Sequence, residues 1–405
     1  MKPQAMVLSR GLFLILAAAA CSKGGVGPNP AAPIVTAGRD STLPAGTSYT
    51  LAAAFADSTS NSSPWSYQVA WGDGASSNGT KSSVSPITAT HLYGAEGSYK
   101  VTVTVTNARN ETGTGSLTVA ATAPVILAAG DIGDCARTSD DSTGKLLDNL
   151  SGVVMPLGDI AYVNGTPTEF ANCFGAAWGR VKARMHPVPG NHDYYCNATS
   201  GLAGCTSPAA GYFGYFGSAA GDPTKGYYDF TLGKWLVIVI NTGTEHIADY
   251  AVGSPQEVWL KSELASHTEP CIVAMWHHPR FTTITGRPPI RPEVQPLWDD
   301  LYQAGATLVL NGHDHVYQRF APQKPDGTAD PAFGIRQLTV GTGGGEGLYS
   351  FDSIPAGSNL QVRDNRTFGV LQLTLRDGGY DWNFIPAHGF GTFTDSGSGS
   401  CHGKP

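Results

Sequence analysis

The chain has 405 residues, enough for two or three domains, and its 41% hydrophobic and 14% charged content is ordinary for globular protein. A formal net charge of −7 leaves no basic footprint, so we expect no nucleic acid as a dedicated ligand. The 51 glycines favour turns and strands over helical bundles.

The N-terminus has the pattern of an export signal. Two basic residues, Lys2 and Arg10, precede an apolar stretch over residues 11–20. This stretch is shorter than the roughly 20 residues that a bilayer-spanning helix needs. Residues 1–21 are therefore predicted to be a targeting segment and are excluded from the fold.

Cys21 follows small residues and resembles the lipidated cysteine of a lipoprotein signal. A lipid on Cys21 would attach the protein to a membrane, whereas ordinary cleavage near Ala18 or Ala20 would release it. Either outcome predicts an exported protein, anchored at the cell envelope or secreted. Residues 22–33, rich in Gly, Pro and Ala, are predicted to form a tether.

Residues 34–121 have an all-β pattern. Residues 101–106 alternate Val and Thr, which is typical of a half-buried strand. Turn-forming clusters at 57–61 and 72–74 separate short strands, so we expect a small β-sandwich. No set of catalytic residue types occurs in this part of the sequence.

Residues 123–405 are predicted to form one layered α/β domain. Continuous apolar runs, typical of strands buried on both faces, cover 125–129, 153–157, 235–240, 272–276 and 307–310. Ser254 to Glu257 match a capping box with Pro at the first helical position, and residues 293–304 favour a second helix.

Short runs of metal-binding residue types follow several of these strands. They lie at 130–133, 158–162, 189–193, 276–279 and 311–315, and together supply two Asp, one Asn, one Tyr and three His. Sites in open α/β sheets assemble at the carboxyl ends of strands. Carboxylate and phenolate oxygens suit a hard trivalent ion, and imidazole and amide suit a divalent transition metal. These runs predict a two-metal site.

Two known families resemble the two halves of the sequence. Residues 71–74 (Trp-Gly-Asp-Gly) and 91–103 resemble the PKD-type immunoglobulin-like domain. The order of the metal-binding runs is similar to that of calcineurin-like metallophosphoesterases. Tyr162 three residues after Asp159, Gly133 after Gly-Asp-Ile, and the run 312–319 make purple acid phosphatases the closer resemblance. The resemblance implies a four-layer α/β/β/α sandwich behind a small all-β domain.

The resemblance also implies ligand roles. A trivalent ion, expected to be iron, would be held by Asp131, Tyr162 and His315, and a divalent ion (Zn, Mn or Fe) by Asn191, His277 and His313, with Asp159 bridging both. A metal-bound hydroxide would attack phosphorus in line. Asn191 and His192 would contact the substrate, with His192 hydrogen-bonding the phosphoryl oxygens.

One stretch departs from the family pattern. Plant-type relatives carry further His residues that assist the leaving group, but residues 280–287 contain none. His278, Arg280 and Arg287 are candidate substrate contacts instead, since Arg suits phosphate. His278 is either a catalytic residue or a structural support of the site. The acid that protonates the leaving group stays open.

Six cysteines follow Cys21, an even number that favours disulfides in an exported chain. Cys196 and Cys205 flank a short loop and are the easiest pair to close. The expected partners of the other four are Cys135 with Cys173 and Cys271 with Cys401.

The leading hypothesis is an acid phosphatase that hydrolyses phosphate monoesters outside the cytoplasm. A phosphodiesterase or nucleotidase on the same metals is the second. The third is a surface adhesion protein whose β-sandwich binds a carbohydrate or protein and whose metal domain is vestigial. An intact ligand set argues against the third.

Overall fold

The structure is a computed structural model that describes residues 32–58, 62–244 and 249–405. The predicted targeting segment, Cys21 and most of the predicted tether lie outside these residues. Among the described helices, none is long and apolar enough to cross a membrane.

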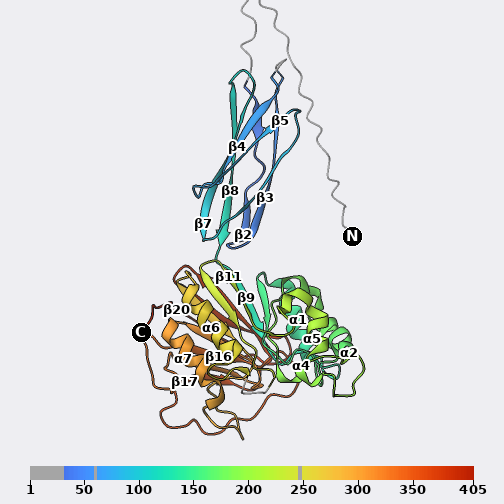
Figure 1. The fold of residues 1–405 in the computed structure, drawn as a ribbon, viewed down its shortest axis with the longest axis vertical. Coiled ribbons are helices and arrows are strands. Elements are labelled where there is room, and N and C mark those ends of the chain that lie inside the picture. Colours follow the sequence, from blue (N-terminus) through green and yellow to red (C-terminus); the bar gives the residue numbers. More distant parts are fainter. Residues whose placement is uncertain (1–31, 59–61, 245–248) are drawn as a thin grey trace, which may run out of the picture.

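The N-terminal domain is a sandwich of two β-sheets, as predicted (Figure 1). One sheet consists of β1 (Ile34–Thr36), β3 (Ser48–Ala56) and β6 (Ile87–Leu92). The other runs in the order β2 (Ser41–Pro44), β8 (Thr112–Thr122), β7 (Gly97–Thr106), β4 (Trp65–Ala70) and β5 (Ser76–Lys81). In β7, Val101, Val103 and Val105 are buried and alternate with half-exposed threonines, so the period of two in the sequence marks the core face.

The second domain contains two further sheets. The seven-stranded sheet runs β11 (Tyr228–Leu232), β12 (Trp235–Val239), β13 (Cys271–Met275), β14 (Leu308–Asn311), β16 (Arg336–Val340), β15 (Tyr317–Phe320) and β17 (Leu360–Asp364). The five-stranded sheet runs β10 (Val153–Pro156), β9 (Val125–Ala129), β18 (Gly369–Arg376), β19 (Gly379–Pro386) and β20 (Asp395–Ser400). Strands β12, β13, β14 and β16 are parallel, as are β9 and β10.

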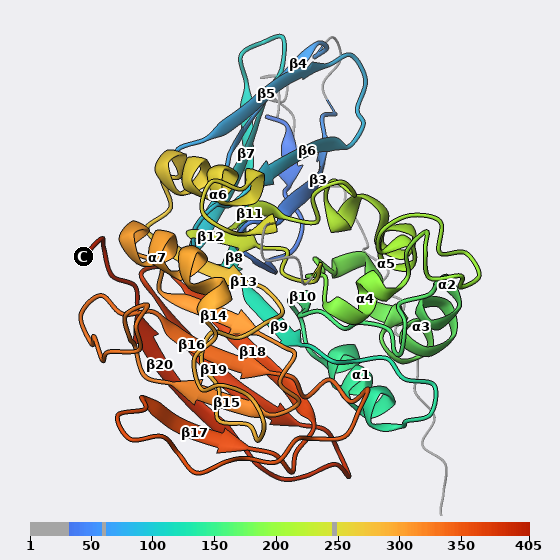
Figure 2. The same cartoon turned by 60° about the horizontal axis from the view of Figure 1, so that its bottom comes forward.

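Helices cover the outer side of each sheet, which completes four layers (Figure 2). On one side lie α6 (Pro255–Ser266) and α7 (Gln295–Ala304). On the other lie α1 (Ser139–Asn149), α2 (Pro167–Glu169), α3 (Gly175–Ala177), α4 (Asn191–Tyr195) and α5 (Ala210–Phe216), with short 3-10 or π turns at 170–174, 179–184, 217–220 and 292–294.

The two cores show why strands of this domain are apolar on both faces. Along β12, Trp235, Val237 and Val239 belong to the core shared with the five-stranded sheet. Leu236 and Ile238 belong to the core under α6 and α7. A strand covered on both faces has no polar side, so the sequence shows a continuous apolar run. The predicted layered α/β fold is confirmed.

The predicted start of α6 is correct, with one difference. Ser254 Oγ accepts a hydrogen bond from the backbone N of Glu257 at 3.2 Å, which is the expected cap. The Glu257 carboxylate does not return to Ser254; it accepts from the backbone N of Gly253 at 3.1 Å. Helix α7 begins at Gln295, because a 3-10 turn over Pro292–Val294 precedes it.

Three disulfides join the predicted pairs of cysteines, Cys135–Cys173, Cys196–Cys205 and Cys271–Cys401. The last links β13 to the C-terminal segment across 130 residues of sequence.

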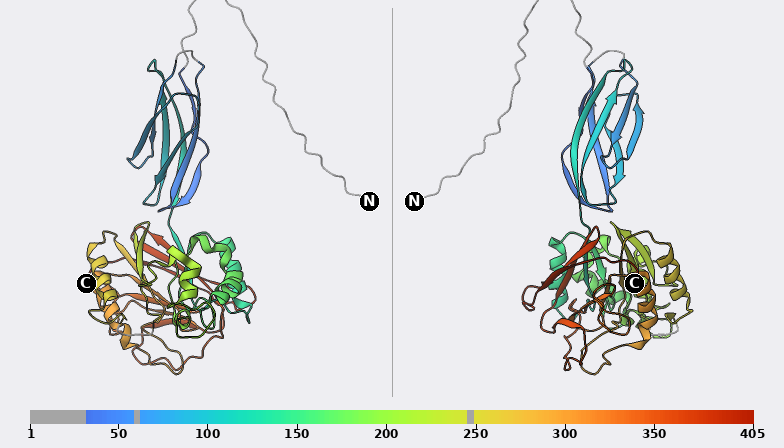
Figure 3. Two further views of the ribbon diagram at one scale, coloured as in Figure 1. Left: turned by 45° about the vertical axis from the view of Figure 1, so that its right-hand side comes forward. Right: turned by 90° about the vertical axis from the view of Figure 1, so that its left-hand side faces the viewer.

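The two domains meet at one end of the second domain, where a short connection leads from β8 into β9 (Figure 3). The backbone N of Asp377, in the turn between β18 and β19, donates to Glu96 Oε1 at 3.0 Å.

Candidate metal centre

Polar side chains converge where four parallel strands end. Asp131 follows β9, and Asp159 and Tyr162 follow β10. His277 and His278 follow β13, and His313 and His315 follow β14. Asn191 and His192 begin α4, and a parallel bridge between Leu157 and Val188 sets the segment before that helix beside the end of β10. This is the edge at which open α/β sheets place their sites.

One group of side chains surrounds the hydroxyl of Tyr162. This hydroxyl donates to Asp131 Oδ1 at 3.0 Å and lies 3.2 Å from His315 Nε2. His315 Nε2 and Asp131 Oδ1 are also 3.2 Å apart. All three residues are buried. Two oxygen donors and one imidazole therefore face a common point.

A second group lies around His277. Its Nε2 is 3.0 Å from Asp159 Oδ2 and 3.3 Å from His313 Nδ1. Asp159, His277 and His313 present ligand atoms that all lie within 4.8 Å of one another, close enough to share one ion. Asn191 donates from Nδ2 to the Tyr195 hydroxyl at 3.0 Å, and its buried Oδ1 has no hydrogen-bond partner in the structure. A buried amide oxygen without a partner is costly unless it binds a cation.

Asp159 connects the two groups. The oxygen that contacts His277, Oδ2, is also 3.4 Å from the Tyr162 hydroxyl. His277 Nδ1 lies 2.8 Å from the backbone carbonyl oxygen of Leu157, and His315 Nδ1 lies 3.2 Å from that of Gly347. Metal-binding histidines commonly donate their second N–H in this way, which leaves Nε2 for the metal. The donor set fits two metal ions that share the Asp159 carboxylate.

The backbone holds these side chains in a strained conformation. Asp131, Asp159 and His313 have φ of 63°, 49° and 65°, in the left-handed region that non-glycine residues seldom occupy. Backbone hydrogen bonds fix them there: His313 N donates to Asp131 Oδ2 at 2.9 Å, and His192 N donates to Asp159 Oδ1 at 2.8 Å. Such strain persists where surrounding structure enforces it, and it accumulates at functional sites.

Gly158, just before Asp159, shows how closely the strand ends approach. It has φ of +85°, and a Cβ there would lie 2.4 Å from His277 Nδ1. Glycine is therefore required both for the backbone conformation and for the space that His277 occupies. The loop over residues 341–345 lies behind the site, since Gly345 N donates to Asp131 O at 2.9 Å.

The electrostatics of the site favour positive charge. Burial alone would lower the pKa of His277, but Asp159 and Asp131 raise it to about 9. Burial, together with Asp131 and Asp159, raises the pKa of Tyr162 well above its usual value. Burial and the Asp159 charge raise the pKa of Asp193 to about 8. The charges of Asp159 and Asp131 therefore favour a cation at this position, which is the His277 imidazolium when no metal ion is bound.

Both histidines predicted to be catalytic lie at this centre. His192 is half-buried; its Nδ1 donates to Val163 O at 2.6 Å, and its Nε2 is 4.0 Å from Asp159 Oδ2. The His278 ring packs 4.1 Å from the His313 ring, and its Nδ1 lies 3.0 Å from Thr242 Oγ1. Burial, with His277 and Arg291, lowers the pKa of His278 well below its usual value, so its ring is neutral.

The two predicted arginine contacts differ. The structure does not bring Arg280 to the site: its buried guanidinium donates to Pro325 O, to Arg291 O and to Gln295 Oε1. Arg287 lies beside the site, where Nη1 is 3.0 Å from Asp314 Oδ1. Its guanidinium is 5.7 Å from the centre of the Tyr349 ring, which stacks on His315 at 4.2 Å.

Sequence reasoning missed several residues of the site, including Thr242, Tyr195, Arg291 and Tyr349. Thr242 follows β12 as Asp131 follows β9, so the rule that located the ligands also points to it. A hydroxyl is not a typical ligand for iron or zinc, so the residue type at this position does not indicate a metal site. Tyr195 is the last residue of the short helix α4, and Arg291 and Tyr349 lie on connecting segments, where sequence spacing does not determine the direction of a side chain.

Comparison with known families agrees with this geometry. A family model described as PKD domain matches residues 30–123, and one described as calcineurin-like phosphoesterase matches residues 124–317. The chain carries a PKD domain followed by a calcineurin-like phosphoesterase domain. Every candidate metal ligand, from Asp131 to His315, falls within the matched part of the phosphoesterase domain.

Curated relatives of the phosphoesterase domain include plant enzymes. The chain is 25% identical over 297 residues to purple acid phosphatase 15 of Arabidopsis thaliana, covering 65% of this chain and 52% of that protein. It is 30% identical over 158 residues to purple acid phosphatase 22 of the same plant, covering 38% and 35%. The chain thus spans about half the length of the first relative and about a third of the second.

Among solved structures, the PKD domain is similar to that of an M14-like peptidase from a Thermoplasmatales archaeon. The two are 25% identical, and the match covers 22% of this chain and 92% of that one with a TM-score of 0.20.

Proposed function

We propose that this chain is an exported phosphatase that hydrolyses phosphate monoesters at a two-metal centre. The observation that carries the proposal is the position of Asp159, whose Oδ2 lies within 3.4 Å of both the Tyr162 hydroxyl and His277 Nε2. A carboxylate between two groups of ligands suits a pair of ions, and two-metal sites are used for displacement at phosphorus. The purple acid phosphatase relatives support the same reaction.

Each group of ligands suits a different ion. Asp131, Tyr162 and His315 would hold a trivalent ion, proposed to be iron, because two of the three donors are hard oxygens. Asn191, His277 and His313 would hold a divalent ion: zinc, manganese or iron. Bound there, the two ions would supply the charge that polarises a phosphate and activates water.

We assign His278 the role of donating one hydrogen bond to the substrate. Thr242 Oγ1 accepts from the backbone N of His278 at 3.3 Å, so its own hydrogen is available to His278 Nδ1 at 3.0 Å. This pairing puts the ring proton on Nε2. A neutral imidazole with Nε2–H donates to a phosphoryl or leaving-group oxygen without adding charge to the site.

His192 lies on the side of the centre formed by Tyr162, whose ring is 4.7 Å from its own between centroids. Because Val163 O accepts from Nδ1, Nε2 of His192 points toward Asp159 and the substrate position. His192, Asn191 and Arg287 therefore stay candidate substrate contacts, while the hydrogen bonds of Arg280 remove it from the proposed contacts.

The remainder of the chain suits an exported enzyme. The three disulfides are typical of proteins that fold in an oxidising compartment. We propose residues 1–21 as the targeting segment with lipid on Cys21, 22–33 as the tether, 34–121 as the PKD domain and 123–405 as the catalytic domain. A carbohydrate or protein contact through the PKD domain belongs to the same proposal.

The test combines visible absorption, metal content and activity on the aerobically purified mature protein, with Tyr162→Phe as control. The expected result is a broad visible band that the variant loses, close to two metal ions per chain, and faster hydrolysis of 4-nitrophenyl phosphate than of bis(4-nitrophenyl) phosphate.

A colourless, active protein with two metals would remove the iron assignment. Faster diester turnover would favour a phosphodiesterase. Absence of metal and activity after reconstitution with iron, zinc and manganese would leave an adhesion protein as the better account.

A further inference from the structure

A large groove borders the metal centre on the side of α4. It has a volume of about 1480 Å³, and Asn191, Tyr195, Asn241 and Gly243 are among the residues that line it. Pockets for small ligands usually measure roughly 300–1,000 Å³. Because the candidate ligand Asn191 forms part of its wall, the groove opens directly beside the position of a bound phosphate. It therefore has room for the alcohol part of a phosphate ester.

A row of rings leads from the metal centre into this groove. The centroid of the Tyr162 ring lies 4.7 Å from that of His192, and the His192 centroid lies 4.7 Å from that of Tyr195. Tyr195 ends the row and is 40% exposed, although its hydroxyl accepts a hydrogen bond from Asn191. A ring at this position is the first flat surface outside His192 that a leaving group meets.

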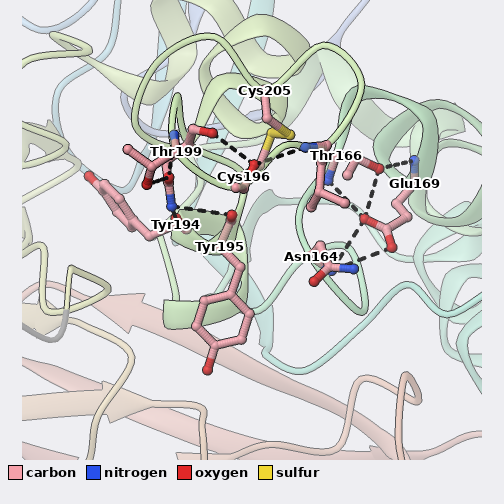
Figure 4. Close-up of a disulfide and its surroundings, with 11 residues drawn as sticks. Asn164, Thr166, Glu169, Tyr194, Tyr195, Cys196, Thr199 and Cys205 are labelled. Carbon is pink, nitrogen blue, oxygen red and sulfur yellow. Dashed lines mark hydrogen bonds between the residues drawn. A yellow bond between two sulfur atoms is a disulfide. The ribbon is translucent and has the colours of Figure 1, made fainter.

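Covalent and hydrogen-bonded links hold the segments around Tyr195. The Cys196–Cys205 disulfide begins at the next residue, and the Tyr195 ring projects from the end of α4 away from that disulfide (Figure 4). On the neighbouring segment, the Glu169 carboxylate accepts from Val163 N at 2.7 Å and from Thr166 N at 2.8 Å. A wall held in this way loses little conformational entropy when a ligand binds.

Other apolar and aromatic side chains line the same groove, Phe213 and Tyr227 among them. On the other side of the metal centre, by contrast, Tyr349 stacks on His315 and lies near the Arg287 guanidinium. The Tyr349 ring is therefore already packed within the site. Among the aromatic residues that line the groove, Tyr195 is the one whose ring packs on His192, at 4.7 Å between centroids.

We propose that the Tyr195 ring is the specificity-determining wall of a leaving-group subsite for phosphate esters whose alcohol carries a flat ring. The proposal rests on the proposed phosphatase function and names the substrate class for it. Stacking of a ring on an aromatic side chain strengthens binding by about tenfold or more. Esters of open-chain alcohols make no such contact, so the subsite separates the two classes.

The test uses two non-hydrolysable probes, phenylphosphonate and methylphosphonate, and measures their binding to the metal-loaded full chain by calorimetry. Two variants separate the parts of the side chain: Tyr195→Leu keeps apolar volume without the ring, and Tyr195→Phe keeps the ring without the hydroxyl. The wild type is expected to bind phenylphosphonate about tenfold more tightly than methylphosphonate. Tyr195→Leu should abolish this preference, and Tyr195→Phe should keep it.

Any disturbance of Asn191 by loss of the hydroxyl weakens both probes equally and leaves their ratio unchanged. Equal binding of the two probes by the wild type, or an unchanged preference in Tyr195→Leu, would overturn the subsite. Turnover of phenyl phosphate and glycerol 2-phosphate is measured in parallel. If neither ester is hydrolysed while the binding preference follows the ring, the phosphatase proposal fails and the subsite stands.

Discussion

The contact between Thr242 and His278 shows how one hydroxyl sets the chemistry of a neighbouring ring. Thr242 Oγ1 lies 3.3 Å from the backbone N of His278 and 3.0 Å from its Nδ1. The backbone N can only donate, so the hydroxyl accepts from it and keeps its own hydrogen available for Nδ1, which is the proposed arrangement. The ring is buried near His277, Asp159 and two arginines, where either tautomer would otherwise be available.

Replacing Thr242 with Val is therefore expected to lower kcat about tenfold with a smaller change in KM, since this shape-matched change removes only the hydroxyl. Steady-state kinetics on a phosphate monoester measures it, with metal content and the thermal midpoint recorded in parallel. Thr242→Ser retains the hydroxyl and should restore most of the rate. If the Ser variant is as slow as the Val variant, Thr242 acts through packing rather than through the tautomer.

At the same scale, residue type and spacing predicted the candidate ligands but not every substrate contact. Asp131 and Asp159 follow strands whose ends meet, so their convergence follows from the parallel sheet. Arg280 and Arg287 lie on one irregular segment, and its path decides their directions. Arg280 turns into the protein, where two carbonyls and an amide satisfy its guanidinium. No local pattern in the sequence encodes that path.

At the scale of elements, the packing of α6 on α7 places acidic side chains close together. Burial and the charge of Glu257 on α6 raise the pKa of Asp300 on α7 to about 6. In the unfolded chain the same group has a pKa of about 3.9. The folded state thus holds the proton of Asp300 more tightly. The contribution of this group to stability is therefore most favourable below about pH 4 and declines as the pH rises to about 6.

Asp300→Asn removes this dependence. At about pH 7 the variant is expected to be more stable by about 1 kcal/mol, a value discounted because the carboxylate is only half-buried and solvent screens it. At about pH 4 the gain should vanish, because Asp300 is then protonated in both states. Urea unfolding at the two pH values measures this. Asp299→Asn, an exposed neighbour on the same helix, should change stability little at either pH.

Strands buried on both faces were the elements best predicted from sequence. Runs such as 125–129 and 272–276 correspond closely to β9 and β13. Strands β18, β19 and β20 were not predicted one by one. Half-exposed positions interrupt the apolar residues of β18 and β19, and β20 consists of Asp, Ser and Gly alone. Their pairing is also long-range: Leu371 of β18 lies opposite Ala128 of β9. Pairing across such a distance leaves no periodic signal in either strand.

At the scale of the whole molecule, β9 separates the PKD domain from the metal centre. The PKD domain ends just before the first residue of β9, and Asp131 follows the last residue of this strand. Five residues of strand span roughly 17 Å. The described contact between Glu96 and Asp377 lies at the turn that follows β18, which runs antiparallel to β9. This turn is therefore at the end of the sheet opposite to the metal centre (Figure 1).

Deleting residues 34–121 is thus expected to leave kcat/KM for a phosphate monoester within about twofold, because the sheets that carry the ligands keep their own two cores and three disulfides. Steady-state kinetics on the metal-loaded truncated protein measures this. Glu96→Ala in the full chain is the matched control, since it removes the contact with Asp377 but keeps the domain. A fall beyond tenfold in the deletion, with Glu96→Ala at the wild-type rate and metal content unchanged in both, would mean that the PKD domain takes part in catalysis despite its distance from the site.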